Sequence, residues 1–128
     1  MKNLLLLSTL TLSLMFSAAS SAEWTEVFES AEGDKHYVDF ERIRKVNGMV
    51  YYWRIQDFLE PGPEGEMSIK VYSKAGCETM RVMPLSLSAY KLPIAVGTAT
   101  GTWTPDPKWA YAAPDSVAEA ELLAVCAH

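Results

Sequence analysis

The sequence predicts an α+β domain in which an antiparallel β-sheet of about five to six strands packs against a C-terminal α-helix, with one disulfide. Three observations predict this fold: segments in which apolar and polar residues alternate, turn-forming residues between those segments, and a capped apolar stripe near the C-terminus. Residues 23–128 are long enough to bury one hydrophobic core. We therefore expect a single domain over residues 23–128.

Residues 1–22 have the three-part layout of a secretory signal peptide. Lys2 is their only charged residue, a leucine-rich apolar run follows, and small residues end at Ala22. The apolar run is shorter than the ~20 residues that span a bilayer, which disfavours a retained membrane anchor. We expect cleavage after Ala22 and a periplasmic or secreted product with no membrane span. The residue directly after the expected cleavage site is Glu23 and not a cysteine, so we expect no lipidation there.

Two short strands and one helical turn are predicted at the start of the domain. Residues 24–28 alternate and end ahead of a Gly-Asp turn, and residues 36–40 form a second extended piece. Asp39 should cap a helical turn over residues 41–44, because its carboxylate can accept hydrogen bonds from the unpaired amides of a first turn.

An antiparallel hairpin is the clearest prediction. Residues 49–58 and 67–74 alternate, and the Pro- and Gly-rich residues 61–65 between them cannot continue a strand. The apolar count selects one face of residues 49–58 as core, and we expect this face to carry Met49, Tyr51, Trp53 and Ile55. The other face is mixed, and we expect it to be accessible to solvent.

Further strands are expected in the second half of the domain. Residues 77–83 predict a strand that Pro84 ends, and residues 98–103 predict one more. Scattered prolines and glycines obscure the rest of residues 85–109.

The chain ends in a predicted helix. Ser116 and Glu119 form a capping box, in which each side chain can bond to the other residue's backbone amide. The apolar stripe that should pack on the sheet consists of Ala118, Leu122 and Val125.

Cys77 and Cys126 are the only cysteines of the chain, and both follow the expected leader. In an oxidising compartment such a pair is most simply a disulfide. A loop of this length gives about 4 kcal/mol in the chain-entropy model. A redox motif or a zinc site is disfavoured, because there is no C-x-x-C spacing and no further soft ligand near either cysteine. The bond would tie the last helical turn to the sheet.

Charge and residue content exclude several classes of function. Removing Lys2 from the 11 basic residues leaves 10 against 16 acidic residues, a balance that disfavours nucleic acid and anionic lipid as partners. His36 is the only histidine apart from the terminal His128, and no G-x-S-x-G elbow surrounds a serine. No metal-ligand spacing or nucleotide-binding loop is present. We therefore expect no enzymatic activity, no cofactor and no metal.

A candidate protein-binding surface lies on the mixed face of the predicted hairpin. Aromatic and basic side chains are frequent at recognition surfaces, and this face should present Tyr52, Arg54, Lys70 and Tyr72. The alternative stays open, because the helix must cover one face. If it covers Tyr52 and Tyr72, the candidate surface lies elsewhere.

In the order of its residues, the chain resembles the surface-adhesin protein E family of Gram-negative bacteria. The matching residues extend over nearly the whole domain: Trp24, Tyr37-Val38-Asp39 with Ile43, Gly48, Trp53, Asp57, Ser68-x-Lys70, Cys77, Arg81, Tyr90, Trp109 and Val125-Cys126.

The resemblance implies an antiparallel sheet on a C-terminal helix with a disulfide, as the residues themselves predict. It also implies an adhesin that binds host matrix proteins such as laminin and vitronectin and that can form homodimers. No binding residue of the family corresponds to a sharp motif in this chain. Our hypothesis is an exported, non-catalytic interaction module for host extracellular-matrix or cell-envelope proteins. The alternatives are a small periplasmic enzyme or small-molecule binding protein, and an envelope accessory without a soluble ligand.

Overall fold

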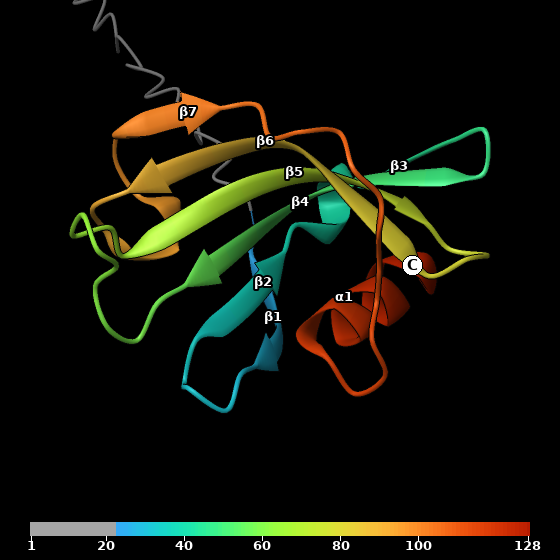
Figure 1. Cartoon of the computed structure of the whole chain (residues 1–128), viewed down its shortest axis with the longest axis horizontal. Helices are drawn as coiled ribbons and strands as arrows, with labels where there is room; N and C mark the ends of the chain where they lie inside the picture. Colours follow the sequence, from blue (N-terminus) through green and yellow to red (C-terminus); the bar gives the residue numbers. More distant parts are fainter. Residues whose placement is uncertain (1–22) are drawn as a thin grey trace, which may run out of the picture.

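The computed structural model describes residues 23–128. The expected signal peptide, residues 1–22, lies outside the described residues. In Figure 1 one twisted sheet runs across the molecule, and the C-terminal helix lies against one side of it. Within residues 23–128, no helix is long and apolar enough to cross a membrane.

The sheet has a path of six strands with two short strands attached to it, and every strand pair is antiparallel. This confirms the predicted antiparallel architecture. The strands of the path are, in order, β1 (Thr25–Glu29), β2 (Lys35–Val38), β4 (Met49–Asp57), β5 (Ser68–Gly76), β6 (Arg81–Tyr90) and β7 (Gly101–Trp103). The attached strands are β3 (Arg44–Val46), which pairs with β4, and β8 (Ala110–Tyr111), which pairs with β6.

The predicted helix is α1 (Val117–Cys126), and its start is capped as expected. The Ser116 hydroxyl accepts a hydrogen bond from the Glu119 amide at 3.1 Å. The return bond of the capping box shifts by one residue, because the Glu119 carboxylate accepts from the Asp115 amide at 3.3 Å.

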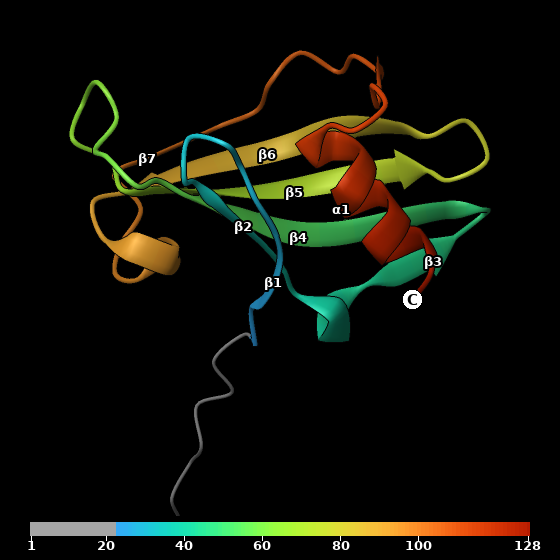
Figure 2. The same ribbon diagram turned by 90° about the horizontal axis from the view of Figure 1, so that it is seen from below.

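The helix crosses the face of β4 and β5, as Figure 2 shows from below. Leu122 and Val125 of the predicted stripe are fully buried there, and burying an aliphatic side chain of this size contributes about 1.5–3 kcal/mol. The core between helix and sheet consists of Val38, Val50, Tyr52, Ala75, Leu122 and Val125.

The disulfide between Cys77 and Cys126 is confirmed. It joins the end of α1 to the turn that follows β5.

Two 3-10 turns complete the fold. In η1 (Phe40–Arg42) the Asp39 carboxylate accepts a hydrogen bond from the Glu41 amide at 3.2 Å, so the predicted cap is confirmed. The second turn, η2 (Pro93–Ala95), contacts β4, β5 and β6.

Strand boundaries in the second half of the domain were predicted wrongly, since β7 begins only at Gly101 and both ends of β6 differ. Residues 77–80 form a turn, and β6 begins at Arg81 and continues through Pro84. A bulge explains the tolerance of proline, which has no N–H for a regular ladder. Tyr72 pairs with Ser86 and Ser73 pairs with Pro84, so Leu85 is the extra residue between them.

Candidate functional site on the open sheet face

The sheet face away from α1, which we call the open face, gathers most of the aromatic and basic side chains of the central hairpin. Across β4 and β5, Trp53 pairs with Tyr72 and Tyr51 pairs with Lys74. Ile55 pairs with Lys70 on the same face. Ile55 is fully buried outside the core beneath α1, at the end where η2 contacts β4.

The four predicted site residues do not share a face, so that prediction is wrong. Tyr52 pairs with Ser73 and Arg54 pairs with Val71, which places Tyr52 and Arg54 on the helix side. Lys70 and Tyr72 lie on the open face. In this register the even-numbered residues of β4 share a face with the odd-numbered residues of β5. The prediction had instead placed the even-numbered residues of both strands on one face.

Tyr52 and Arg54 instead bind a carboxylate of the helix. The Tyr52 hydroxyl donates a hydrogen bond to Glu121 Oε2 at 3.1 Å. Arg54 Nε lies 3.5 Å from Glu121 Oε1 in an ion pair that lacks hydrogen-bond geometry. Burial raises the pKa of Glu121, and Arg54 and Tyr52 oppose that rise. Burial also raises the pKa of the Tyr52 phenol. The prediction that the core face of β4 carries Met49, Tyr51 and Trp53 was therefore wrong as well. The helix packs on the opposite face, where Tyr52 and Arg54 contact Glu121.

A small pocket of about 250 Å³ lies beside this cluster, under the start of α1. His36 and Ser73 line it with Arg54 and Glu121, and His36 Nδ1 and Ser73 Oγ have no hydrogen-bond partner in the described chain. Burial lowers the pKa of His36, and Arg54 lowers it further. The pocket thus brings a histidine and a carboxylate together, but no hydrogen bond links a nucleophile to a base there.

An aromatic ladder crosses the centre of the open face. The ring centroids of Trp53 and Tyr72 are 4.6 Å apart, and those of Tyr51 and Tyr72 are 6.2 Å apart. These are the separations at which aromatic rings attract one another. All three side chains are partly exposed. The ladder therefore presents rigid apolar surface to solvent.

Three cations of the open face are held by aromatic rings. Lys74 Nζ lies 5.8 Å from the Tyr51 ring, and the Arg81 guanidinium lies 4.1 Å from the Trp109 ring. Lys70 Nζ lies 5.6 Å from the Trp53 ring and 5.2 Å from the Tyr90 ring. Within residues 23–128 none of the three cations has a carboxylate at ion-pair distance. Positive charge on this face is therefore available to a ligand.

Three carboxylates of the strands also belong to the open face: Glu26, Glu29 and Asp57. Glu26 lies on the outer strand β1, opposite Tyr37. Asp57 accepts a hydrogen bond from the Ile94 amide of η2 at 2.8 Å, so this carboxylate stabilises the η2 turn. The acidic residues of this face therefore lie away from the ladder.

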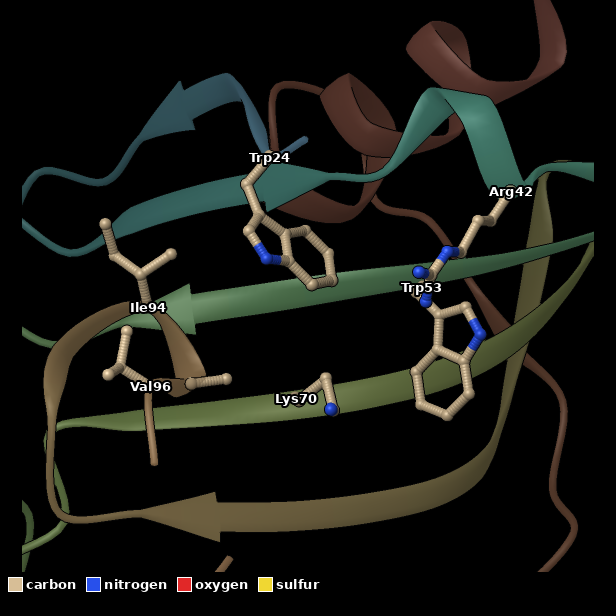
Figure 3. Close-up of a pocket in the computed structure, with 7 residues that line it drawn as sticks. Trp24, Arg42, Trp53, Lys70, Ile94 and Val96 are labelled. Atoms are coloured by element: carbon tan, nitrogen blue, oxygen red, sulfur yellow. The ribbon is translucent and has the colours of Figure 1, made fainter. Parts of the chain in front are cut away.

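A pocket of about 480 Å³ opens at the η2 end of this ladder (Figure 3). In the close-up, the Trp24 side chain lies between Ile94 and Arg42. Lys70 projects from β5 between Val96 and Trp53. The lining residues come from five parts of the chain: Trp24, Arg42, Trp53, Lys70, Ile94, Ala95 and Val96.

The sequence did not reveal this pocket. Trp24 and Arg42 were assigned to a strand and a helical turn, and residues 94–96 lie in a stretch that prolines and glycines obscured. No local spacing signals a site whose members meet only through the sheet register. One signal was present on the other face: Glu121 lies one position before Leu122 in the apolar stripe, and such an acid requires a polar partner on the sheet.

Metal ligands do not cluster in the described chain. Within residues 23–128, no group of three or more histidine, cysteine, aspartate or glutamate side chains could hold an ion.

One protein family and several solved structures resemble this chain. A family model described as surface-adhesin protein E matches residues 24–127. A crystal structure of Haemophilus influenzae protein E aligns with a TM-score of 0.62 at 16% identity, covering 84% of this chain and 89% of that chain. Protein E from non-typeable Haemophilus influenzae aligns with a TM-score of 0.57 at 16% identity, covering 86% and 79%. No curated protein sequence matches the chain. At this identity the structural likeness shows the shared fold.

Proposed function

The chain belongs to the surface-adhesin protein E family, and from this premise we propose that it is an exported, non-catalytic module that binds host extracellular-matrix or cell-envelope proteins. Residues 1–22 would direct its export, leaving a periplasmic or secreted domain. The binding surface would be the open face.

One observation supports this surface above all others. The open face exposes an aromatic ladder beside cations that have no carboxylate partner within the described chain. Partly exposed aromatic and arginine side chains are the residues that contribute most at protein interfaces. Because the domain is acidic as a whole, a local excess of positive charge would also orient an approaching acidic partner.

The proposal is tested with purified laminin and vitronectin on a biosensor surface. The double variant Tyr51→Ala, Tyr72→Ala removes two members of the ladder, and we expect it to weaken capture by at least about tenfold. Trp103→Ala is the matched control, because Trp103 is 47% exposed and its partner Leu87 pairs with Val71 on the helix side of the sheet. It should bind like the wild type. Equal capture by all three proteins, with unchanged melting temperatures, would refute the surface.

A second candidate function uses the pocket beneath α1. The unpartnered His36 Nδ1 and Ser73 Oγ favour a small polar molecule there. Such a ligand should raise the melting temperature of the wild type and not that of His36→Phe. A metabolite panel that gives no such shift would exclude this function for the molecules in the panel.

The homodimer implied by the family resemblance is a further prediction. Light scattering on the purified domain in solution would measure its mass, and the prediction is the mass of two copies of the domain.

A further inference from the structure

We propose that the pocket between Trp24, Arg42, Trp53, Lys70 and the η2 turn receives a carboxylate side chain and its apolar neighbour from an extended segment of a protein partner. The inference rests on the proposed function, since it names the chemistry that the open face would select. Three features of the pocket carry it: its hydrogen-bonding groups, its charge and its fixed apolar wall.

The polar groups on the lining side chains are all donors. Arg42 and Lys70 have no acceptor atoms, and the indoles of Trp24 and Trp53 each offer only an N–H. A carboxylate consists of acceptors and would satisfy such donors. Sugar hydroxyls need acceptors as well as donors, and a ligand rich in them would leave some of its own groups unpaired. The side chains therefore favour an acidic group over a neutral glycan.

Within residues 23–128, carboxylates neutralise only part of the positive charge of the pocket. Lys70 has aromatic rings around its ammonium group and no carboxylate at ion-pair distance within residues 23–128. Arg42 Nε lies 3.4 Å from the buried Asp39 carboxylate, while 55% of the Arg42 side chain stays exposed. Arg42 is thus held in place with donors to spare. A bound carboxylate would meet one anchored and one unmatched cation.

The apolar wall is fixed in advance by the sheet. Ile94 and Ala95 adopt positive φ values of 54° and 52°, which are unfavourable for a β-branched residue in particular. Hydrogen bonds hold the turn in this state: the Ile94 amide donates to Asp57 at 2.8 Å, and the Ala95 amide donates to Ser68 Oγ at 2.9 Å. Such local strain is typical of sites that are organised before the ligand arrives. The wall would contact the apolar neighbour of the carboxylate.

An extended peptide fits better than a free small acid. Trp53 belongs both to the pocket and to the aromatic ladder, where its ring centroid lies 4.6 Å from that of Tyr72. A volume of about 480 Å³ accommodates one or two side chains. The adjoining residues of a peptide would continue over Tyr72, whereas a free acid would leave the ladder unused.

Calorimetric titration of the domain with short synthetic peptides tests the proposal. We expect a peptide of alternating glutamate and leucine to bind about tenfold more tightly than its glutamine-leucine counterpart, with an affinity that falls as salt is added. Lys70→Met should remove most of that preference. Lys108→Met, which removes an exposed lysine outside the pocket, should preserve it. Val96→Asp, at a position that is 57% exposed, should repel the glutamate peptide without affecting the fold.

Equal binding of the two peptides, or a glutamate preference that survives both Lys70→Met and Val96→Asp, would overturn the proposal. Tighter binding of octanoate or of a sulfated disaccharide than of the glutamate peptide would also overturn it, in favour of a free acid or a glycan. The proposed function fails separately: it depends on laminin or vitronectin capture through Tyr51 and Tyr72, which the peptide titration does not measure.

Discussion

Replacing both cysteines with serine tests how much stability the bond between Cys77 and Cys126 provides. The bond joins residues 49 positions apart, and the chain-entropy model gives about 4 kcal/mol for a loop of this length. A domain of this size has about 5–15 kcal/mol of unfolding free energy. The variant should therefore keep its fold at room temperature, with its melting temperature lowered by about 20 °C.

The structure indicates that this loss arises mainly in the unfolded chain. The helix is also held by the buried Leu122 and Val125 and by the hydrogen bond from Tyr52 to Glu121. Without the bond, α1 should thus stay docked, while the unfolded chain becomes less restricted. Its larger exposed surface should increase the urea dependence of the unfolding free energy.

Urea unfolding followed by near-ultraviolet circular dichroism measures both effects. Wild type in its oxidised and reduced states provides the control, because the reduced protein should unfold like the double-serine variant. A loss below about 1 kcal/mol would refute the chain-entropy reasoning. A near-ultraviolet signal that disappears without urea would instead show that helix docking depends on the bond.

Three further predictions concern the interface under α1. Tyr52→Phe removes the donor to Glu121 Oε2 and should cost about 1–3 kcal/mol in urea unfolding; a neutral result would mean that the carboxylate finds water instead. Because the pKa of Glu121 is raised above 4.5 in the folded state, the wild type should lose stability relative to Glu121→Gln as pH rises from about 4.5 through that higher pKa; a constant difference across this range would contradict the assigned burial effect. Leu122→Ala should cost about 2–5 kcal/mol by thermal unfolding, since Leu122 is fully buried, and a loss under 1 kcal/mol would argue against the docked helix.

The elements of the fold could be predicted because their signals are local. The alternation in residues 49–58 and the capping box at Ser116 depend only on neighbouring residues, and both elements are present. The cysteine pair was equally readable, because only two cysteines are available. Strand β6 was misjudged at Pro84, where a bulge in the pairing compensates for the missing amide.

The faces of the sheet could not be predicted in the same way. Each strand showed its own alternation, but the relation between β4 and β5 depends on the pairing register across a loop, and a shift of one residue exchanges the faces. The apolar count favoured the Trp53 side as core, whereas the helix carries Glu121 inward and pairs with the polar Tyr52 and Arg54. The candidate surface therefore moved to the open face, with Lys70 and Tyr72 retained.

The most direct measurement of the central claim is site-specific photocrosslinking to whichever of laminin or vitronectin the domain captures. A photoreactive phenylalanine analogue at Tyr72 reports on the open face. The same analogue at Leu123, which is 56% exposed on the helix, reports on the opposite side of the sheet. The open-face account predicts a crosslinked partner from position 72 and none from position 123. Crosslinks from position 123 with none from position 72 would contradict it.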